Sequence, residues 1–216
     1  MKWLFIFLLL SPSVVAWDYE GHEIIAEYVY YSTDMQFKNF NLSRLKEGSI
    51  APDKIFRDQR RHHYPNSFNL ALLWLNNDSD ASFNFGVASH YISDSFASPH
   101  YIKGEKYSDH ALFEKQARSI YIECRNYGFD LENSLRKGSF NYKDWKPWLV
   151  SKSKSIPENE FNDAARLVLS VAIEKFNLSC LNHTQVQEVE YFDYRIFRNI
   201  SIVLVLSLVF LYFLNH

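Results

Sequence analysis

Histidines and carboxylates gather in the segment 90–100, which reads HYISDSFASPH. His90 and Asp94 are four residues apart, so on a helix they lie side by side on one face. His110 and Glu114 repeat this spacing a little further along the chain. Two such pairs, pointing inward from two helices, form metal sites in helix bundles, and imidazole with carboxylate suits zinc and similar metals. The segment therefore predicts a metal site, with His100 close to it.

The distribution of histidine along the chain supports this prediction. Of the eight histidines, only His183 and His216 lie beyond position 110. Any one of these residues alone would be an ordinary surface or core histidine. Their concentration around the two helical pairs favours a shared function as metal ligands.

The elements that would position these residues are helices. Helical periodicity is visible over 22–32, 69–75, 83–97, 108–127 and 159–178, whereas runs with the alternation of a strand are few. Ser108 or Asp109 is the expected N-cap of the fourth segment. We therefore expect an all-α fold, a compact multi-helix bundle of six to eight helices with the metal site in its core.

Composition excludes some classes of protein. Apolar residues make up 47% of the chain and aromatic residues 17%, which is typical of a folded domain. The formal net charge of −2 argues against a groove for duplex nucleic acid. A local cluster of cations does occur at Arg57, Arg60 and Arg61.

Both ends of the chain resemble processing or membrane segments. Residues 1–16 combine Lys2, a short apolar run and small residues up to Ala16, as in a secretory signal peptide. Cleavage there would leave Trp17 at the N-terminus, the alternative being an uncleaved anchor. Residues 196–214 form an apolar stretch that predicts a C-terminal transmembrane helix. A buried core helix and a lipid-attachment tail removed from the mature protein are the alternatives.

We accordingly expect a signal peptide over 1–16, a catalytic domain over 17–194 and a membrane anchor over 196–214. The protein would be exported and anchored, with the catalytic domain on the outer side of the membrane. Cys124 and Cys180 are the two cysteines of the chain, and in an exported protein a disulfide between them is expected. Two buried free thiols are the alternative.

An ordered set of short motifs resembles a known family. WDYEGH follows the expected cleavage site, and APD, HHY, HYISDSFASPH and HALFE come after it. Together they resemble the trinuclear zinc phosphodiesterases, which include bacterial zinc-dependent phospholipases C and fungal single-strand-specific zinc nucleases. The resemblance extends over roughly residues 17–115. It implies a helical hydrolase that binds three zinc ions.

The resemblance also implies the ligands. They are Trp17, His22, Asp53, His62, His90, Asp94, His100, His110 and Glu114. One zinc would take the terminal amine and carbonyl of Trp17 together with His22. Asp94 would bridge this ion to a second zinc on Asp53, His62 and His90. The third zinc would be bound by His100, His110 and Glu114.

Two assignments stay open in this scheme. The chain reads His62-His63-Tyr64 where the family has one histidine followed by aromatic residues, and the alignment favours His62 over His63 as the ligand. Asp53 is the candidate catalytic residue, as a ligand, a general base or both.

The expected activity is hydrolysis of phospholipid phosphodiester bonds by a zinc-activated water, in a phospholipase C that acts as a monomer. Glu20, the fourth residue after cleavage, is the candidate contact to a cationic head group. A single-strand-specific nuclease is the alternative, favoured by the form W-x3-G-H at Trp17. A non-catalytic exported metal-binding domain is the lesser alternative.

Overall fold

The structure is a computed structural model that describes residues 19–58 and 61–181. Trp17, the expected signal peptide and the expected anchor over 196–214 lie outside the described residues. In the described part, none of the helices has the length and apolar character needed to cross a membrane.

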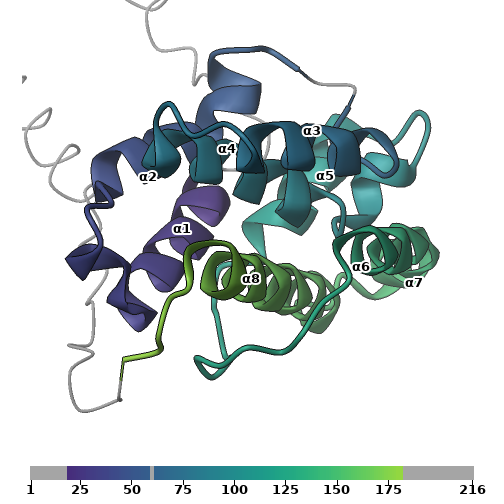
Figure 1. Ribbon diagram of the computed structural model, residues 1–216. Helices are drawn as coiled ribbons and strands as arrows, with labels where there is room; N and C mark the ends of the chain where they lie inside the picture. Colours follow the sequence, from purple (N-terminus) through teal and green to yellow (C-terminus); the bar gives the residue numbers. More distant parts are fainter. Residues whose placement is uncertain (1–18, 59–60, 182–216) are drawn as a thin grey trace, which may run out of the picture. The chain divides into compact units, whose positions relative to one another are not determined.

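The described part of the chain is helical, which confirms the predicted all-α class (Figure 1). It contains α1 (Tyr19–Ser32), η2 (Asp34–Phe37), α2 (Leu42–Lys54), α3 (Asn66–Leu75), α4 (Ala81–Asp94), η3 (Ser98–Tyr101), α5 (Tyr107–Lys115), α6 (Leu131–Gly138), η4 (Ser139–Asn141), α7 (Tyr142–Ser151) and α8 (Ser155–Phe176). The elements labelled η are short 3-10 helices. A single β-bridge joins Thr33 and Cys180 in these residues.

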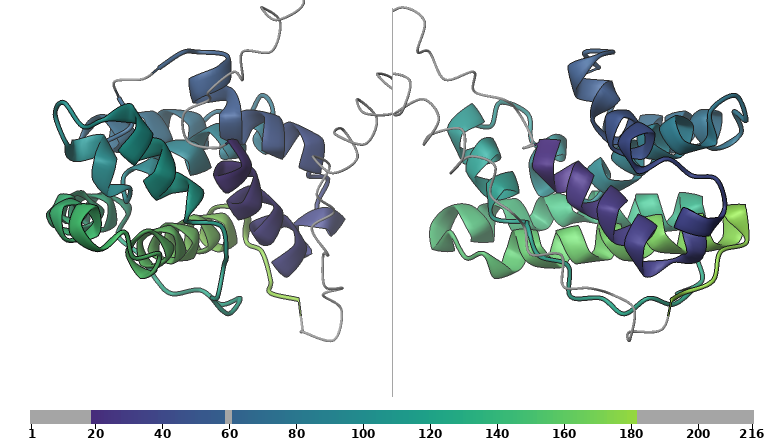
Figure 2. Two further views of the ribbon diagram at one scale, coloured as in Figure 1. Left: turned by 180° about the vertical axis from the view of Figure 1, so that it is seen from behind. Right: turned by 90° about the vertical axis from the view of Figure 1, so that its left-hand side faces the viewer.

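Helix α4 lies between the other helices and carries the central part of the predicted site. Twelve of its fourteen residues are buried, and it packs against α1, α2, α3 and α8 (Figures 1 and 2). Asp80 caps its first turn by accepting a hydrogen bond of 3.0 Å from the backbone N–H of Phe83. Because α4 is buried on nearly all sides, its polar residues His90 and Asp94 lie in the interior of the protein.

Gly48 of α2 and Gly86 of α4 allow these two helices to approach closely. A Cβ atom on Gly48 would lie 2.1 Å from the carbonyl oxygen of Phe83, and one on Gly86 would lie 2.2 Å from that of Leu45. Both distances are far shorter than a van der Waals contact. Only glycine fits at these two positions, so the spacing between α2 and α4 depends on them.

The helix predicted over 108–127 is wrong beyond Lys115. Helix α5 begins at Tyr107, ahead of the predicted caps, and the backbone of 117–123 is not helical. The side chain of Asn162 holds this stretch, accepting from the N–H of Tyr121 at 2.7 Å and donating to the carbonyl of Ser119 at 3.0 Å. These tertiary hydrogen bonds satisfy backbone groups that a helix would otherwise satisfy.

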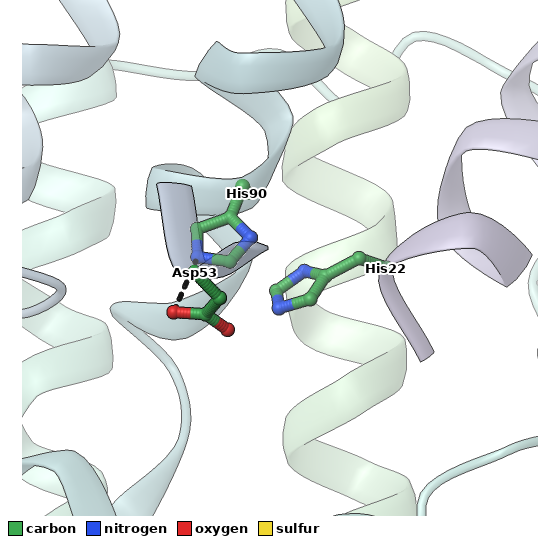
Figure 3. Close-up of side chains that lie close together, drawn as sticks. All are labelled: His22, Asp53 and His90. Atoms are coloured by element: carbon green, nitrogen blue, oxygen red, sulfur yellow. Dashed lines mark ion pairs between the residues drawn. The ribbon is translucent and has the colours of Figure 1, made fainter. Parts of the chain in front are cut away.

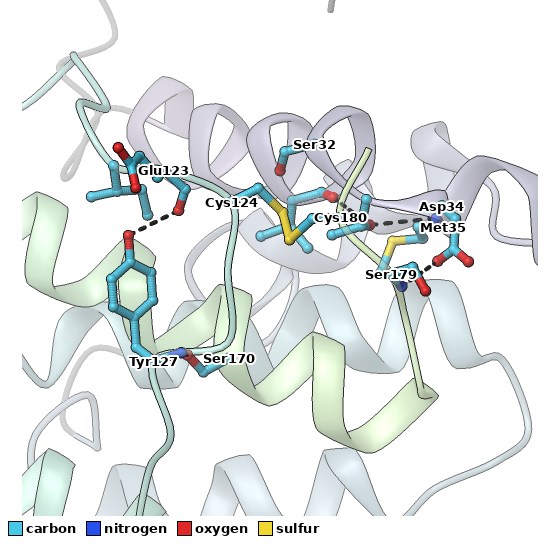
Figure 4. The surroundings of a disulfide bond; sticks show 12 residues. Ser32, Asp34, Met35, Glu123, Cys124, Tyr127, Ser170, Ser179 and Cys180 are labelled. Atoms are coloured by element: carbon cyan, nitrogen blue, oxygen red, sulfur yellow. Dashed lines mark hydrogen bonds between the residues drawn. A yellow bond between two sulfur atoms is a disulfide. The ribbon is translucent and has the colours of Figure 1, made fainter. Parts of the chain in front are cut away.

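Cys124 and Cys180 form a disulfide with their Cα atoms 5.6 Å apart (Figure 4). This confirms the expected pairing and rules out the alternative of two free thiols. The segment after α8 is also bound to η2, because the N–H of Asp34 donates to the carbonyl of Ser179 and the N–H of Ser179 donates to the Asp34 carboxylate, each at 2.9 Å. The end of the described chain is thereby fastened beside the end of α1.

The Gly86→Ala substitution should destabilise the protein and weaken zinc binding. The added methyl group pushes α4 away from α2, and overpacking of this kind costs about 1–3 kcal/mol of unfolding free energy. Chemical denaturation and zinc titration measure the two effects. Asn69→Ala, on the exposed side of α3, is the control and should change neither quantity. A Gly86→Ala protein with unchanged stability would show that the close approach is not required.

Candidate metal centre

Eight of the nine predicted ligands lie in three adjoining groups, and the ninth, Trp17, lies outside the described residues. The groups are His22, Asp53 and His90; His62, Asp94 and His100; and His100, His110 and Glu114. Within each group the donor atoms are all within 4.8 Å of one another. His100 belongs to the second and third groups. Asp94 of the second group lies 3.3 Å from His22 and 3.1 Å from His90 of the first, so the three groups form one continuous cluster.

The first group is assembled from three helices (Figure 3). His22 comes from α1, Asp53 from α2 and His90 from α4. The rings of His22 and His90 stack with their centroids 3.9 Å apart, and Nε2 of His90 lies 3.8 Å from Oδ1 of Asp53. The geometry groups His22 with Asp53, whereas the resemblance placed them on different ions.

Asp94 is the centre of the cluster. Nitrogen atoms of four histidines lie near its carboxylate: His22 at 3.3 Å, His62 at 2.7 Å, His90 at 3.1 Å and His100 at 3.9 Å. The shared carboxylate therefore touches both the first and the second group, as a bridging ligand would.

The polar atoms at Asp94 are arranged for binding a metal and not for hydrogen bonding to one another. Neither carboxylate oxygen of Asp94 has a partner in hydrogen-bonding geometry, and the same holds for Nε2 of His62. Buried polar atoms are normally paired. A cation is bound where lone pairs converge on one point and no hydrogen-bond donor occupies them. Imidazole nitrogen and carboxylate oxygen are ligands that suit zinc.

The third group is built on the exposed side of the cluster. Nε2 of His110 lies 2.6 Å from Oε1 of Glu114, one helical turn away on α5. Nε2 of His100, from η3, lies 3.2 Å from the same oxygen. Glu105 contacts Nδ1 of His110 at 3.2 Å and so orients the ring toward Glu114.

Two further hydrogen bonds orient the buried histidines. Nδ1 of His90 donates to the carbonyl of Ser49 at 2.8 Å, and Nδ1 of His22 lies 3.0 Å from Oγ of Ser93. In both rings Nε2 then points to the cluster. Such outer contacts fix the tautomer and the ring plane of a metal-binding histidine. The Ser49 contact depends on the close approach of α2 and α4.

Charge and burial act against each other in the cluster. Burial opposes protonation of His90, but the carboxylates of Asp94 and Asp53 outweigh it and raise the pKa of His90 to about 9. Burial alone would raise the pKa of Asp94, yet the histidines around it, His90 first, hold that pKa well below its usual range. Burial lowers the pKa of His22 and raises that of Asp53.

The cluster is open to solvent on one side. The Asp53 side chain is 14% exposed, whereas those of Asp94 and Glu114 are 1% and 0% exposed. His100 and His110 are also partly exposed. A substrate would therefore approach the cluster beside Asp53, His100 and His110.

His63 and Glu20 lie outside the cluster. His63 is half-buried, and its ring faces that of Tyr101 at 5.6 Å, whereas the neighbouring His62 is buried within the second group. Glu20, in the first turn of α1, pairs with Arg118 at 2.7 Å between Oε2 and Nη1. The pairing with Arg118 was not predicted from the sequence, in which the two residues are far apart.

Sequence reasoning missed Glu160, a buried residue of α8. Its carboxyl group accepts the backbone N–H of Ser98 at 2.8 Å and contacts the Ser98 hydroxyl, two residues before His100. That hydroxyl also lies 2.6 Å from the carbonyl of Asn141. One hydroxyl proton cannot serve two acceptors, so a protonated Glu160 that donates to Ser98 satisfies every group.

The environment of Glu160 supports this protonation. Burial raises the pKa of Glu160 to about 8. The available sequence signal was a glutamate on the apolar face of a helix, because Glu160 has the helical spacing of the buried Pro157, Phe161 and Ala164. Glu160 thus supports η3 and with it His100.

One comparison with known proteins found a match. The family model for zinc dependent phospholipase C matches residues 21–171, a region that contains the eight clustered residues and leaves Trp17 and Glu20 just before it. Neither the curated proteins nor the solved structures gave a match.

Zinc binding to the metal-free protein should release protons at pH 7. The pKa values of His90 and His110 are raised to about 9 by neighbouring carboxylates, although burial opposes this, so both rings carry a proton below that pH. A ligand histidine must be neutral, so zinc affinity should increase as the pH rises toward 9. Titration calorimetry in two buffers of different ionisation enthalpy measures the release. Identical heats in both buffers would contradict the assignment.

The Asp94→Asn substitution should reduce zinc content more than Glu114→Gln. Asp94 lies between two groups of donors, whereas Glu114 belongs to one. Metal analysis of the purified variants, together with their residual activity, makes the comparison. The two substitutions each remove one charge and keep the shape of the side chain, so each is the control for the other. Equal losses would rule out a bridging role for Asp94.

Proposed function

Because the chain belongs to the zinc-dependent phospholipase C family, we propose that it hydrolyses the phosphodiester bond of phospholipids with water as the nucleophile. The observation that carries this proposal is the cluster of eight histidine and carboxylate residues inside the matched region. Zinc is the cofactor of the family. Three adjoining groups of donors support three ions.

The proposed ligands are the nine residues that the sequence indicated. They are Trp17, His22, Asp53, His62, His90, Asp94, His100, His110 and Glu114. Zinc bound there supplies an activated water at neutral pH and stabilises negative charge on the phosphate oxygens. No nucleophilic side chain is needed for such a reaction.

Asp53 is the proposed catalytic residue. Among the three carboxylates of the cluster it is the one with appreciable exposure, so it can contact both water and the substrate. It would orient the attacking water and accept its proton. Asp94 and Glu114 are enclosed and would act as ligands alone. His100 and His110 flank the open side and would lie next to the bound phosphate.

Glu20 is the proposed contact to the head group of the lipid. It lies two residues before His22 on α1, and its carboxylate is paired with Arg118. A cationic head group would have to displace this arginine. The ion pair therefore lowers the preference for phosphatidylcholine that Glu20 alone would give.

We further propose that the protein is exported and held at a membrane. The disulfide between Cys124 and Cys180 suits an oxidising compartment. Residues 1–16 would be the signal peptide, 17–194 the catalytic domain and 196–214 the anchor. Anchoring would raise the local concentration of lipid at the site, an advantage that a dissolved nucleic acid would not share.

The full chain, purified from a host that exports it, should cleave phosphatidylcholine vesicles and release the phosphorylated head group. Single-stranded DNA at a matched phosphate concentration should remain intact, because the proposed site serves a lipid phosphodiester. Assays of both substrates make the comparison, with a chelated sample and a zinc-restored sample as controls. If DNA is cleaved rapidly and the vesicles stay intact, the phospholipase assignment is wrong and the protein is a single-strand-specific nuclease.

The Arg118→Gln substitution should increase the preference for phosphatidylcholine over phosphatidylglycerol, and Glu20→Gln should decrease it. The first change leaves the Glu20 carboxylate available to a quaternary ammonium group, and the second removes its charge. The ratio of kcat/KM for the two lipids measures the effect. The double variant is the control and should follow Glu20→Gln, since Arg118 acts through that carboxylate. Unchanged ratios would exclude Glu20 from head-group recognition.

A further inference from the structure

We propose that the end of α2 is a membrane-contact surface that places the open side of the metal cluster against an anionic lipid bilayer. The surface, called here the α2 tip, consists of Lys54, Ile55, Phe56 and Arg57, together with Leu73 of α3. The inference rests on the proposed function, since it concerns how a bilayer substrate reaches that site.

The α2 tip exposes apolar side chains beside the catalytic cluster. Ile55 is 52% exposed, Phe56 40% and Leu73 64%. Ile55 and Phe56 follow Asp53 by two and three residues. Scattered exposed apolar residues are ordinary, but a group of them next to a functional site indicates an interaction surface.

The aromatic side chain of the α2 tip, Phe56, is held in place by stacking. The ring of Phe56 stacks on Trp74 with centroids 5.5 Å apart, and Trp74 in turn contacts the ring of Phe83. This stacking joins the end of α2 to α3, next to Leu73. A rigid surface loses little conformational entropy on binding.

The backbone of the tip is ordered as well. The N–H of Phe56 donates to the carbonyl of Ala51, and that of Asp58 donates to the carbonyl of Pro52, both at 2.9 Å. Arg57 adopts a left-handed conformation with φ of 52°, which ends the helix. In the right-hand view of Figure 2 the blue end of α2 stands out from the neighbouring helices.

Charge identifies the lipid that the tip would contact. Lys54 and Arg57 are exposed on either side of the apolar pair, and neither forms an ion pair in the described part of the chain. Asp58, which follows Arg57, is buried, and its carboxylate accepts from Tyr91 and Arg61. Cations that flank apolar side chains are typical of protein segments that lie in the interface of anionic membranes.

The position of the tip gives the contact a function. With Ile55 and Phe56 in the interface, Asp53 would face the layer of lipid phosphates. A phospholipid would then need to rise only a short way to reach the cluster. An apolar pair flanked by cations suits the interface of an anionic bilayer. Binding of a second copy of the chain or of a nucleic acid at this place is an outcome of the test.

A fluorescence measurement on the full chain tests the contact without relying on catalysis. An environment-sensitive dye is attached to Ile55→Cys and, as the control, to Phe37→Cys. Phe37 is 71% exposed and lies on η2, which follows the C-terminal end of α1, whereas His22 lies near the start of that helix. With phosphatidylglycerol-containing vesicles, the dye at position 55 should brighten and blue-shift, while the dye at position 37 should not. Equal responses at the two positions, or none at 55, would overturn the proposal.

An activity measurement tests the consequence of the contact. Replacing Ile55 and Phe56 together by Ser should reduce hydrolysis of vesicle lipid by about tenfold, the factor expected from losing the burial of two half-exposed side chains. Hydrolysis of a monomeric short-chain phosphatidylcholine should be unchanged. Phe37→Ser, the matched control, should retain both activities. Equal loss on both substrates would mean that the tip serves folding or chemistry and would contradict the proposal.

The role of charge is tested with Arg57→Asn, because Asn tolerates the left-handed backbone. It should weaken binding to phosphatidylglycerol vesicles about fivefold, the effect of one cation near an anionic surface, and leave binding to neutral vesicles unchanged. Protein that dimerises through the tip, or that binds single-stranded DNA there and no vesicles, would refute the lipid assignment. A wild-type protein that inserts its tip but cleaves no phospholipid would refute the proposed function alone.

Discussion

The rest of the structure depends on the contacts of one buried carboxylate, that of Asp94. An isolated buried charge costs several kcal/mol, so it persists only where positive charge surrounds it. Nitrogen atoms of four histidines, from α1, α4, η3 and the segment before α3, lie around it. Of these, His90 supplies positive charge in the metal-free protein, because the effect of burial is outweighed by the carboxylates near it, which raise its pKa to about 9. Zinc ions bound between these groups would complete the compensation. The elements of the fold can thus be understood as the supports that keep five polar side chains together in an apolar interior.

The packing of the helices around α4 determines how the histidines of the cluster are oriented. The close contact at Gly48 and Gly86 sets the distance between α2 and α4. At this distance the Ser49 carbonyl of α2 can accept the hydrogen bond from His90 that orients its ring. On the opposite side, α8 provides Glu160, which holds the segment leading to His100. The cluster is therefore fixed by backbone contacts on one side and by a buried carboxyl group on the other. Its open side adjoins the end of α2.

The sequence predicted what depends on local spacing. The helical class and the pairing of His90 with Asp94 followed from residues four apart. Long-range contacts could not be predicted from the sequence. The helix expected over 108–127 ends early because the side chain of Asn162, far along the chain, hydrogen-bonds to the backbone of that segment. The pairing of Glu20 with Arg118 depends on tertiary packing in the same way. Such partners leave no periodic pattern.

X-ray absorption spectroscopy at the zinc edge tests the central claim most directly, because it reports the ligands and the distances between metals in the purified full chain. The account predicts a shell of nitrogen and oxygen at about 2.0–2.2 Å, with imidazole scattering, and a zinc–zinc distance of about 4 Å. The donor groups on either side of Asp94 require both features. A spectrum without a metal–metal distance, or with a sulfur shell at about 2.3 Å, would contradict the account.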